Sequence, residues 1–336
     1  MSRQFRTNRH GAPSESTLDV RQELMRGLEA AVNDLGQLDA GQRWREFTFF
    51  AALWLAGFVL SAIGHRTEYP TDAWLLSIAG LICSAVALNA FVLLLHEGMH
   101  QTLSADARWN RAASVLLDAT VFVSFSAYRV LHTRHHNYLG DRRDPDDYHN
   151  YTDKLWLVWL LHLVRLGFGS LLYLFLIPAL AVKHGTAREH RHIIEKHVFL
   201  GLGYAVILNC LPFATLARYW LVLLLVVGVM VAVRGLTQHG ITDGGDPYLA
   251  SRTLVAYPLI AFCLLNENYH LEHYLFPEVP SYRLAKLHDL IWPRLPYVVT
   301  GRSYLGFIAC FLRATLKFDE RPIGFQRLKH GHTVRT

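Results

Sequence analysis

Long, nearly uninterrupted apolar blocks constrain this chain more than any other feature of its sequence. Residues 47–63, 73–95, 198–217 and 219–233 consist almost wholly of hydrophobic side chains. A helix needs about 20 apolar residues to cross a hydrocarbon core roughly 30 Å thick, so the second block is long enough and the first needs its flanks. We therefore expect an all-α integral membrane protein with four transmembrane helices in two hairpins. The turn of the second hairpin is predicted at residues 216–220.

Two further apolar stretches, residues 113–130 and 155–182, are interrupted by ionisable side chains. Asp118 and Arg129 lie in the first stretch, and His162 and Arg165 lie in the second. Ionisable groups are costly at membrane depth, so we expect both stretches to lie as interfacial helices or to re-enter. With four crossings, both termini and all the histidine groups described below fall on one side of the membrane.

Basic residues are concentrated on that side, and the positive-inside rule therefore predicts that it is cytoplasmic. They are Arg3, Arg6, Arg9, Arg43, Arg45, Lys183, Arg188, Arg191, Lys196, Arg302, Arg313, Lys317, Arg321, Arg327, Lys329 and Arg335. The C-terminal group favours either attraction to anionic headgroups or docking of an acidic electron carrier. The first ten residues lack the apolar segment of a cleavable signal peptide, and one amphipathic helix is expected over residues 17–38.

Eight histidines occur in spaced groups at the ends of apolar stretches. They are His96, His100, His132, His135, His136, His239, His270 and His273. Spacings of three and four residues place imidazoles on one face of a helix. About four such ligands saturate one zinc ion, so eight suit two metals. An all-imidazole set favours iron over magnesium or calcium, which prefer oxygen ligands. We therefore predict a di-iron centre that activates dioxygen.

The remaining histidines lack this spacing and are interpreted as surface or interfacial residues. They are His10, His65, His149, His162, His184, His190, His192, His197, His288, His330 and His332. Glu97 and Glu272 lie inside the histidine groups and are interpreted as outer-shell partners of the metal ligands. Asp144 and Asp146 either accept hydrogen bonds from ligating imidazoles or are solvated loop residues. The cysteines lack CxxC spacing, which argues against disulfides and iron–sulfur ligation.

The motifs HEGMH, HTRHH with its trailing LGDRRDPDDY, and NYHLEHYLFPEVPSYRLAKLH resemble the three histidine boxes of the membrane fatty acid desaturase superfamily. The resemblance implies that residues 45–295 form a membrane domain between a cytoplasmic N-terminal segment, 1–44, and a basic cytoplasmic tail, 296–336. It implies a histidine-rich metal-binding cap in which all eight histidines are ligands, with His239 as the isolated histidine upstream of the third box. It further implies that two iron ions, with dioxygen and two electrons, remove hydrogen from a fatty acyl chain.

One position departs from the family pattern, because Tyr274 stands where the third box ends in a second histidine. Tyr274 either ligates iron as phenolate, leaves an open position for water, or packs. This departure keeps fatty acid hydroxylation and terminal-alkene-forming decarboxylation open beside desaturation. The chain lacks an HPGG haem-attachment motif and a cysteine cluster, so electrons are expected from a separate ferredoxin- or cytochrome-type donor with its reductase. No pattern suggests nucleic-acid binding, and the spans carry no ionisable path for a membrane metal carrier.

Overall fold

The computed structural model describes residues 15–121 and 124–328 of the chain. Several residues used in the sequence predictions lie outside this part, namely Arg3, Arg6, Arg9, His10, Lys329, His330, His332 and Arg335. The chain divides into two compact units. One, which we call the helical unit, comprises Asp39–Val130 and Phe168–Val231. The other, the histidine unit, comprises Met1–Leu38, Leu131–Gly167 and Ala232–Thr336 and contains six of the eight predicted ligands.

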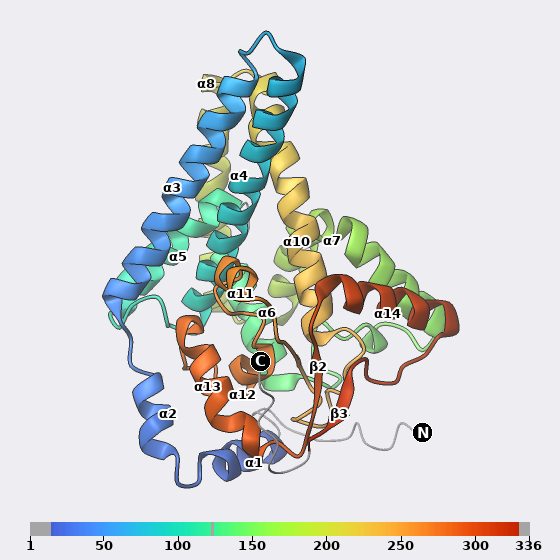
Figure 1. The fold of residues 1–336 in the computed structure, drawn as a ribbon. Coiled ribbons are helices and arrows are strands. Elements are labelled where there is room, and N and C mark those ends of the chain that lie inside the picture. Colours follow the sequence, from blue (N-terminus) through green and yellow to red (C-terminus); the bar gives the residue numbers. More distant parts are fainter. Residues whose placement is uncertain (1–14, 122–123, 329–336) are drawn as a thin grey trace. The chain divides into compact units, whose positions relative to one another are not determined.

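Four helices are long and apolar enough to cross a membrane, and they confirm the predicted all-α membrane fold. They run over Ala40–Gly64 (α3), Pro70–Met99 (α4), Ala187–Cys210 (α8) and Phe213–His239 (α9 to α10). α3 and α4 form the antiparallel hairpin seen in Figure 1. Gly57 and Gly80 allow this close approach, because a Cβ on either would collide with the facing helix.

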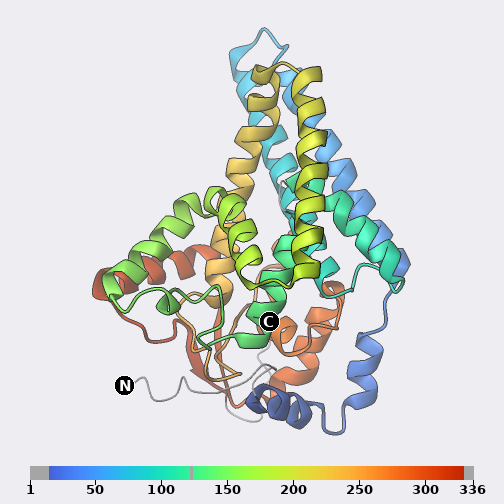
Figure 2. The same ribbon diagram turned by 180° about the vertical axis from the view of Figure 1, so that it is seen from behind.

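The turn of the second hairpin lies at Leu211 and Pro212, so its predicted position at residues 216–220 is wrong. A proline lacks the amide that would continue α8, and it disfavours helical geometry in the residue before it. The chain then forms α9 (Phe213–Leu216), the π-helical segment η3 (Ala217–Leu221) and α10 (Val222–His239). Figure 2 shows α8 in full and the turn that follows it.

The two interrupted apolar stretches form helices of other kinds. α5 (Ala107–Val121) and α6 (Phe125–Tyr138) meet at a bend of 104°, the geometry of a broken span or a re-entrant segment. α7 (Leu155–His184) is a long helix that contains Pro178. In the helical unit, buried Asp118 pairs with Lys196 of α8 at 2.9 Å, so this interrupting charge is compensated.

The histidine unit combines short helices with a small three-stranded sheet, which was not expected from the sequence. Strand order is β1 (Arg252–Leu254), β2 (Tyr297–Gly301), β3 (Phe325–Arg327). β1 pairs with β2 in parallel, with Arg252 opposite Val299, and β2 pairs with β3 in antiparallel, with Val299 opposite Phe325. The helical elements are α11 (Pro258–Cys263), α12 (His270–Leu275), α13 (Leu284–Ile291), α14 (Tyr304–Lys317), η2 (Tyr148–Asn150), η4 (Ser281–Arg283) and η5 (Trp292–Arg294).

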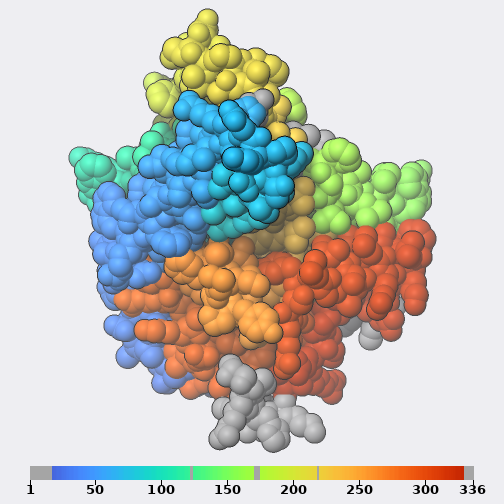
Figure 3. Space-filling model, turned by 45° about the horizontal axis from the view of Figure 1, so that its top comes forward, coloured from blue at the N-terminus to red at the C-terminus, as the bar shows by residue number. Residues whose placement is uncertain are grey.

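The segment expected as a C-terminal tail therefore contains β2, α14 and β3. Figure 3 shows the orange and red C-terminal residues as one continuous surface. Near the N-terminus, the single helix predicted over residues 17–38 is two helices, α1 (Glu15–Met25) and α2 (Glu29–Leu35). Gly27 breaks the predicted helix because its φ of 74° lies in the left-handed region. The core beneath the third box packs Leu24 and Val32 against α12 and α13.

Candidate metal centre

The first histidine box lies at the end of α4, as predicted from its position after an apolar block. His96 is in the last turn of this helix and His100 is its C-cap residue. Their ring centroids are 5.1 Å apart. Between them, Glu97 is 1% exposed and accepts hydrogen bonds from Arg43 and from Thr102, the latter at 2.9 Å. Glu97 thus ties the end of α4 to the start of α3.

The other six predicted ligands lie on three elements of the histidine unit. α6 carries His132, His135 and His136, and α12 carries His270 and His273. His239 is the last residue of α10. The structure sorts these six imidazoles into two groups of three, which helical spacing alone does not distinguish.

The first group consists of His135, His239 and His270. The Nε2 atom of His239 lies 3.3 Å from Nε2 of His135 and 3.0 Å from Nε2 of His270. Each Nδ1 atom faces an acceptor: the Asp144 carboxylate at 2.9 Å, the Ala250 carbonyl at 3.2 Å and the Glu267 carboxylate at 3.3 Å, respectively. An acceptor at Nδ1 holds the proton there and leaves the lone pair on Nε2. The Nε2 atom of His239 therefore lies close to the Nε2 atoms of both other imidazoles.

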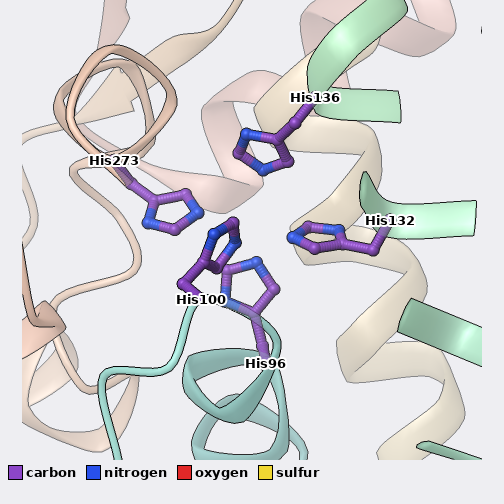
Figure 4. A group of neighbouring side chains, drawn as sticks. All are labelled: His96, His100, His132, His136 and His273. Carbon is purple, nitrogen blue, oxygen red and sulfur yellow. The ribbon is translucent and has the colours of Figure 1, made fainter. Parts of the chain in front are cut away.

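The second group consists of His132, His136 and His273. Each offers one ring nitrogen, and these atoms all lie within 4.8 Å of one another. Ring centroids are 4.5 Å apart for His132 and His136, and 5.3 Å apart for His136 and His273. Figure 4 draws these side chains, and it also draws His96 and His100 at the end of α4. His273 is fully buried, so water has little access to this group.

The two candidate acceptors in the loop after the second box have different roles. Asp144 is 2% exposed and binds His135, which confirms its prediction as a partner of an imidazole. Burial lowers the pKa of His135, but the adjacent Asp144 carboxylate outweighs burial and raises that pKa to about 9. Asp146 instead accepts a hydrogen bond from the Tyr297 hydroxyl at 2.7 Å and lies 3.8 Å from Arg165.

Glu267 is a second carboxylate partner of the ligands, and it is absent from the residues predicted above. Its side chain is 1% exposed and lies 3.3 Å from His270 Nδ1 and 3.9 Å from His273 Nδ1. A signal for it exists in the sequence, because Glu267 precedes His270 by three residues. That spacing places two side chains on one face of a helical turn.

Two of the histidines interpreted as surface or interfacial residues are largely enclosed by other side chains. His288 lies 2.6 Å from the carboxylate of Glu272, which also accepts a hydrogen bond from Thr253 at 2.5 Å. Burial lowers the pKa of His288, and the Glu272 carboxylate outweighs burial and raises it. His162 packs among aromatic rings, including Tyr148 at 4.8 Å. Aromatic neighbours and a carboxylate supplied from other elements enclose these two imidazoles, and local spacing does not indicate such contacts.

Tyr274 is the residue at which the third box departs from the family pattern. It belongs to α12, and its side chain packs in the hydrophobic core of the histidine unit. Its side chain is 7% exposed, and its hydroxyl lies 3.4 Å from the Thr17 hydroxyl. Its ring is 6.0 Å from the ring of His136. Burial raises the pKa of the Tyr274 phenol, which disfavours a phenolate. Of the three alternatives left open by the sequence, these contacts favour packing.

The donor set fits a transition metal. An imidazole that donates from Nδ1 to a carboxylate or carbonyl and ligates through Nε2 is a typical ligand of iron, zinc or copper. Magnesium and calcium require oxygen ligands instead. A helical membrane fold with such a histidine cluster defines the class: a multi-pass membrane protein with a candidate transition-metal site.

Comparison with known proteins gives the particular family: the chain belongs to the fatty acid desaturase family, whose profile matches residues 72–306. This confirms the resemblance drawn from the three boxes. The chain is 23% identical over 246 residues to the sn-2 acyl-lipid omega-3 desaturase (ferredoxin) of Helianthus annuus, and it spans 54% of that protein. It is 19% identical over 266 residues to the sn-1 oleoyl-lipid 12-desaturase of Picosynechococcus, and it spans 74% of it. It is also 36% identical over 76 residues to the dihydrorhizobitoxine desaturase of Bradyrhizobium elkanii, about a fifth of either chain.

Proposed function

We propose that this protein is a membrane di-iron enzyme that uses dioxygen and two electrons to desaturate a fatty acyl chain. The observation that carries the proposal is that the Nε2 atom of His239 lies 3.3 Å from that of His135 and 3.0 Å from that of His270, and that the Nδ1 atom of each ring faces an acceptor. Family membership and similarity to two acyl-lipid desaturases supply the substrate class. The similarity to the dihydrorhizobitoxine desaturase covers too little of the chain to favour another substrate.

Eight imidazoles would hold the two irons. In this proposal His135, His239 and His270 bind one iron. His132, His136 and His273 bind the other. His96 and His100 of the first box are further proposed ligands, as the family resemblance implies. With Tyr274 turned to Thr17, the phenol is not a ligand.

The overall reaction balances with external electrons. Two hydrogen atoms leave adjacent methylenes as a double bond forms, and dioxygen takes up these with two electrons and two protons to give two waters. The bound irons supply the oxidising power. The chain holds the ligands in a fixed orientation through Asp144, Glu267 and the Ala250 carbonyl, and it encloses them away from water. We further propose a cytoplasmic face for the boxes and a ferredoxin- or cytochrome-type electron donor.

Metal analysis and product analysis test this function. Purified protein loaded with iron under anaerobic conditions should hold about two irons per chain, because one ion is saturated by about four imidazoles. His135→Ala should lose one of them, whereas His65→Ala, at an exposed position outside both groups, should retain both. Mass spectrometry of host lipids should show products that are two hydrogens lighter. One zinc per chain and no iron-dependent product would overturn the proposal.

The same product analysis separates the related reactions. A gain of one oxygen would identify a hydroxylase, and loss of carbon dioxide from a fatty acid would identify a decarboxylase that forms a terminal alkene. Either product would be consistent with the proposed metal centre, and it would replace desaturation as the proposed reaction.

A further inference from the structure

Arg252, at the start of β1, is a buried cation that the metal centre does not use directly. Its side chain is 2% exposed. The guanidinium donates to the backbone carbonyls of Gly240 at 3.1 Å, Ile241 at 3.2 Å and Ile323 at 2.9 Å, and also to the Thr237 carbonyl. Within residues 15–121 and 124–328, no carboxylate pairs with it. Backbone carbonyls, together with the ring of Phe307 whose centroid lies 4.6 Å from the guanidinium carbon, therefore compensate this charge.

Three of these carbonyls belong to the segment that ends α10. The last carbonyls of a helix have no partner within the helix and carry its negative dipole end. The planar fork of a guanidinium can satisfy several of them at once, which a lysine ammonium cannot do with the same geometry. Immediately beyond the helix, Ile241 has a φ of 53°, a left-handed conformation that strains a β-branched residue. Arg252 binds the carbonyl of this strained residue.

His239 lies between the carbonyls that Arg252 binds. The two residues before Arg252 contact the same segment: the Ala250 carbonyl accepts from His239 Nδ1 at 3.2 Å, and the Ser251 hydroxyl lies 3.4 Å from the Gln238 carbonyl. Residues 250–252 thus contact the chain before, at and after His239. This histidine has no neighbouring box residue to orient it, so its position depends on these contacts.

The same strand continues to the third box. The Thr253 hydroxyl donates to Glu272, which lies between His270 and His273. The Leu254 amide donates to the Asn268 carbonyl at 2.8 Å, and the Asn268 side chain donates back to the Leu254 carbonyl at 2.8 Å. One short segment therefore connects His239 to the box that supplies His270.

We propose that Arg252 is a positioning residue for the metal centre: it fixes the end of α10 so that His239 meets His270 and His135 at one iron. The inference rests on the proposed function and adds a residue outside the histidine boxes. Arg252 acts only through His239 and touches neither metal nor substrate.

The test compares Arg252→Lys with Arg294→Lys. Both substitutions keep the charge, and Arg294 also donates to backbone carbonyls, those of Leu24 and Arg26, in a region without metal ligands. Full-length proteins in detergent are loaded with iron(II) without oxygen and then challenged with a colorimetric chelator. Arg252→Lys should release one of its two irons at a 10- to 100-fold lower chelator concentration, roughly the effect of losing an outer-shell partner. In the Mössbauer spectrum, the iron signal that Arg252→Lys loses should be the same signal that His239→Ala loses. The spectrum of Arg294→Lys should match that of the wild type.

Arg252→Gln is a second variant, whose neutral amide can donate only two hydrogen bonds where the guanidinium binds four carbonyls. It should loosen the same iron, so the inference remains testable if Arg252→Lys does not fold. Retention of both irons at wild-type affinity in folded Arg252→Lys or, if that variant is unfolded, in folded Arg252→Gln would overturn the inference. A wild-type chain that takes up no iron would instead overturn the proposed function.

Discussion

Removal of the Asp144 carboxylate should weaken one metal site and leave the other intact. Asp144 is 2% exposed, and its Oδ1 accepts from both His135 Nδ1 and the Asp146 amide, each at 2.9 Å. Loss of such an outer-shell partner typically costs about 10- to 100-fold in metal affinity. Since tenfold corresponds to about 1.4 kcal/mol, the expected loss is about 1.4–2.8 kcal/mol.

Two substitutions of Asp144 should fall at opposite ends of this range of lost iron affinity. Asp144→Asn keeps an acceptor oxygen near the imidazole and loses the charge, so it should fall near the tenfold end. Asp144→Ala removes the acceptor and leaves a buried N–H without a partner, at a further cost to folding of about 1–3 kcal/mol. Its iron affinity should fall near the hundredfold end.

The assay is anaerobic iron(II) loading followed by chelator competition, with thermal unfolding of the metal-free chain measured in parallel. Asp146→Asn is the matched control, because that carboxylate binds the Tyr297 hydroxyl and lies near Arg165. Both irons should remain tightly bound in this control. Equally tight binding of both irons by Asp144→Ala and Asp146→Asn would show that the Asp144 carboxylate does not support the metal site at His135.

Three further substitutions probe other contacts of the site. Tyr274→Phe removes only the contact with Thr17, so iron content and the visible spectrum should be unchanged; loss of a visible absorption band would instead indicate a phenolate ligand. Arg43→Gln leaves the buried carboxylates of Glu46 and Glu97 without their cation, and thermal unfolding in detergent should show a loss of about 3–5 kcal/mol. Arg45→Gln, at an exposed position, should lose far less. For His288, the raised pKa means that its pairing with Glu272 stabilises the fold below the unfolded pKa, and that this contribution is lost as pH rises through the folded pKa. The difference in melting temperature between wild type and His288→Gln should therefore shrink from mildly acidic to mildly alkaline pH, and a constant difference would contradict this explanation.

Local sequence patterns determined the membrane fold and the location of the boxes. An apolar block forms a helix in lipid because its backbone must be satisfied internally, so the spans follow from composition alone. The first box continues α4 and His239 ends α10, both as expected from their positions after apolar blocks. The turn of the second hairpin was predicted at residues 216–220 from their aromatic and polar side chains. It lies instead at Pro212, whose missing amide ends α8.

The tertiary structure alone decided which side chains surround each ligand. Helical spacing puts His132, His135 and His136 on one turn, but only packing against α10 and α12 directs His135 to one group and the other two to a second. Asp144 and Asp146 are equivalent in sequence, and the fold buries one against an imidazole and turns the other to Tyr297. The roles of His288 and Arg252 likewise depend on contacts between elements that no local pattern specifies, whereas Glu267 lies only three residues before its partner His270. Such contacts depend on how elements far apart in the chain pack together, whereas periodicity reports only which residues share a face.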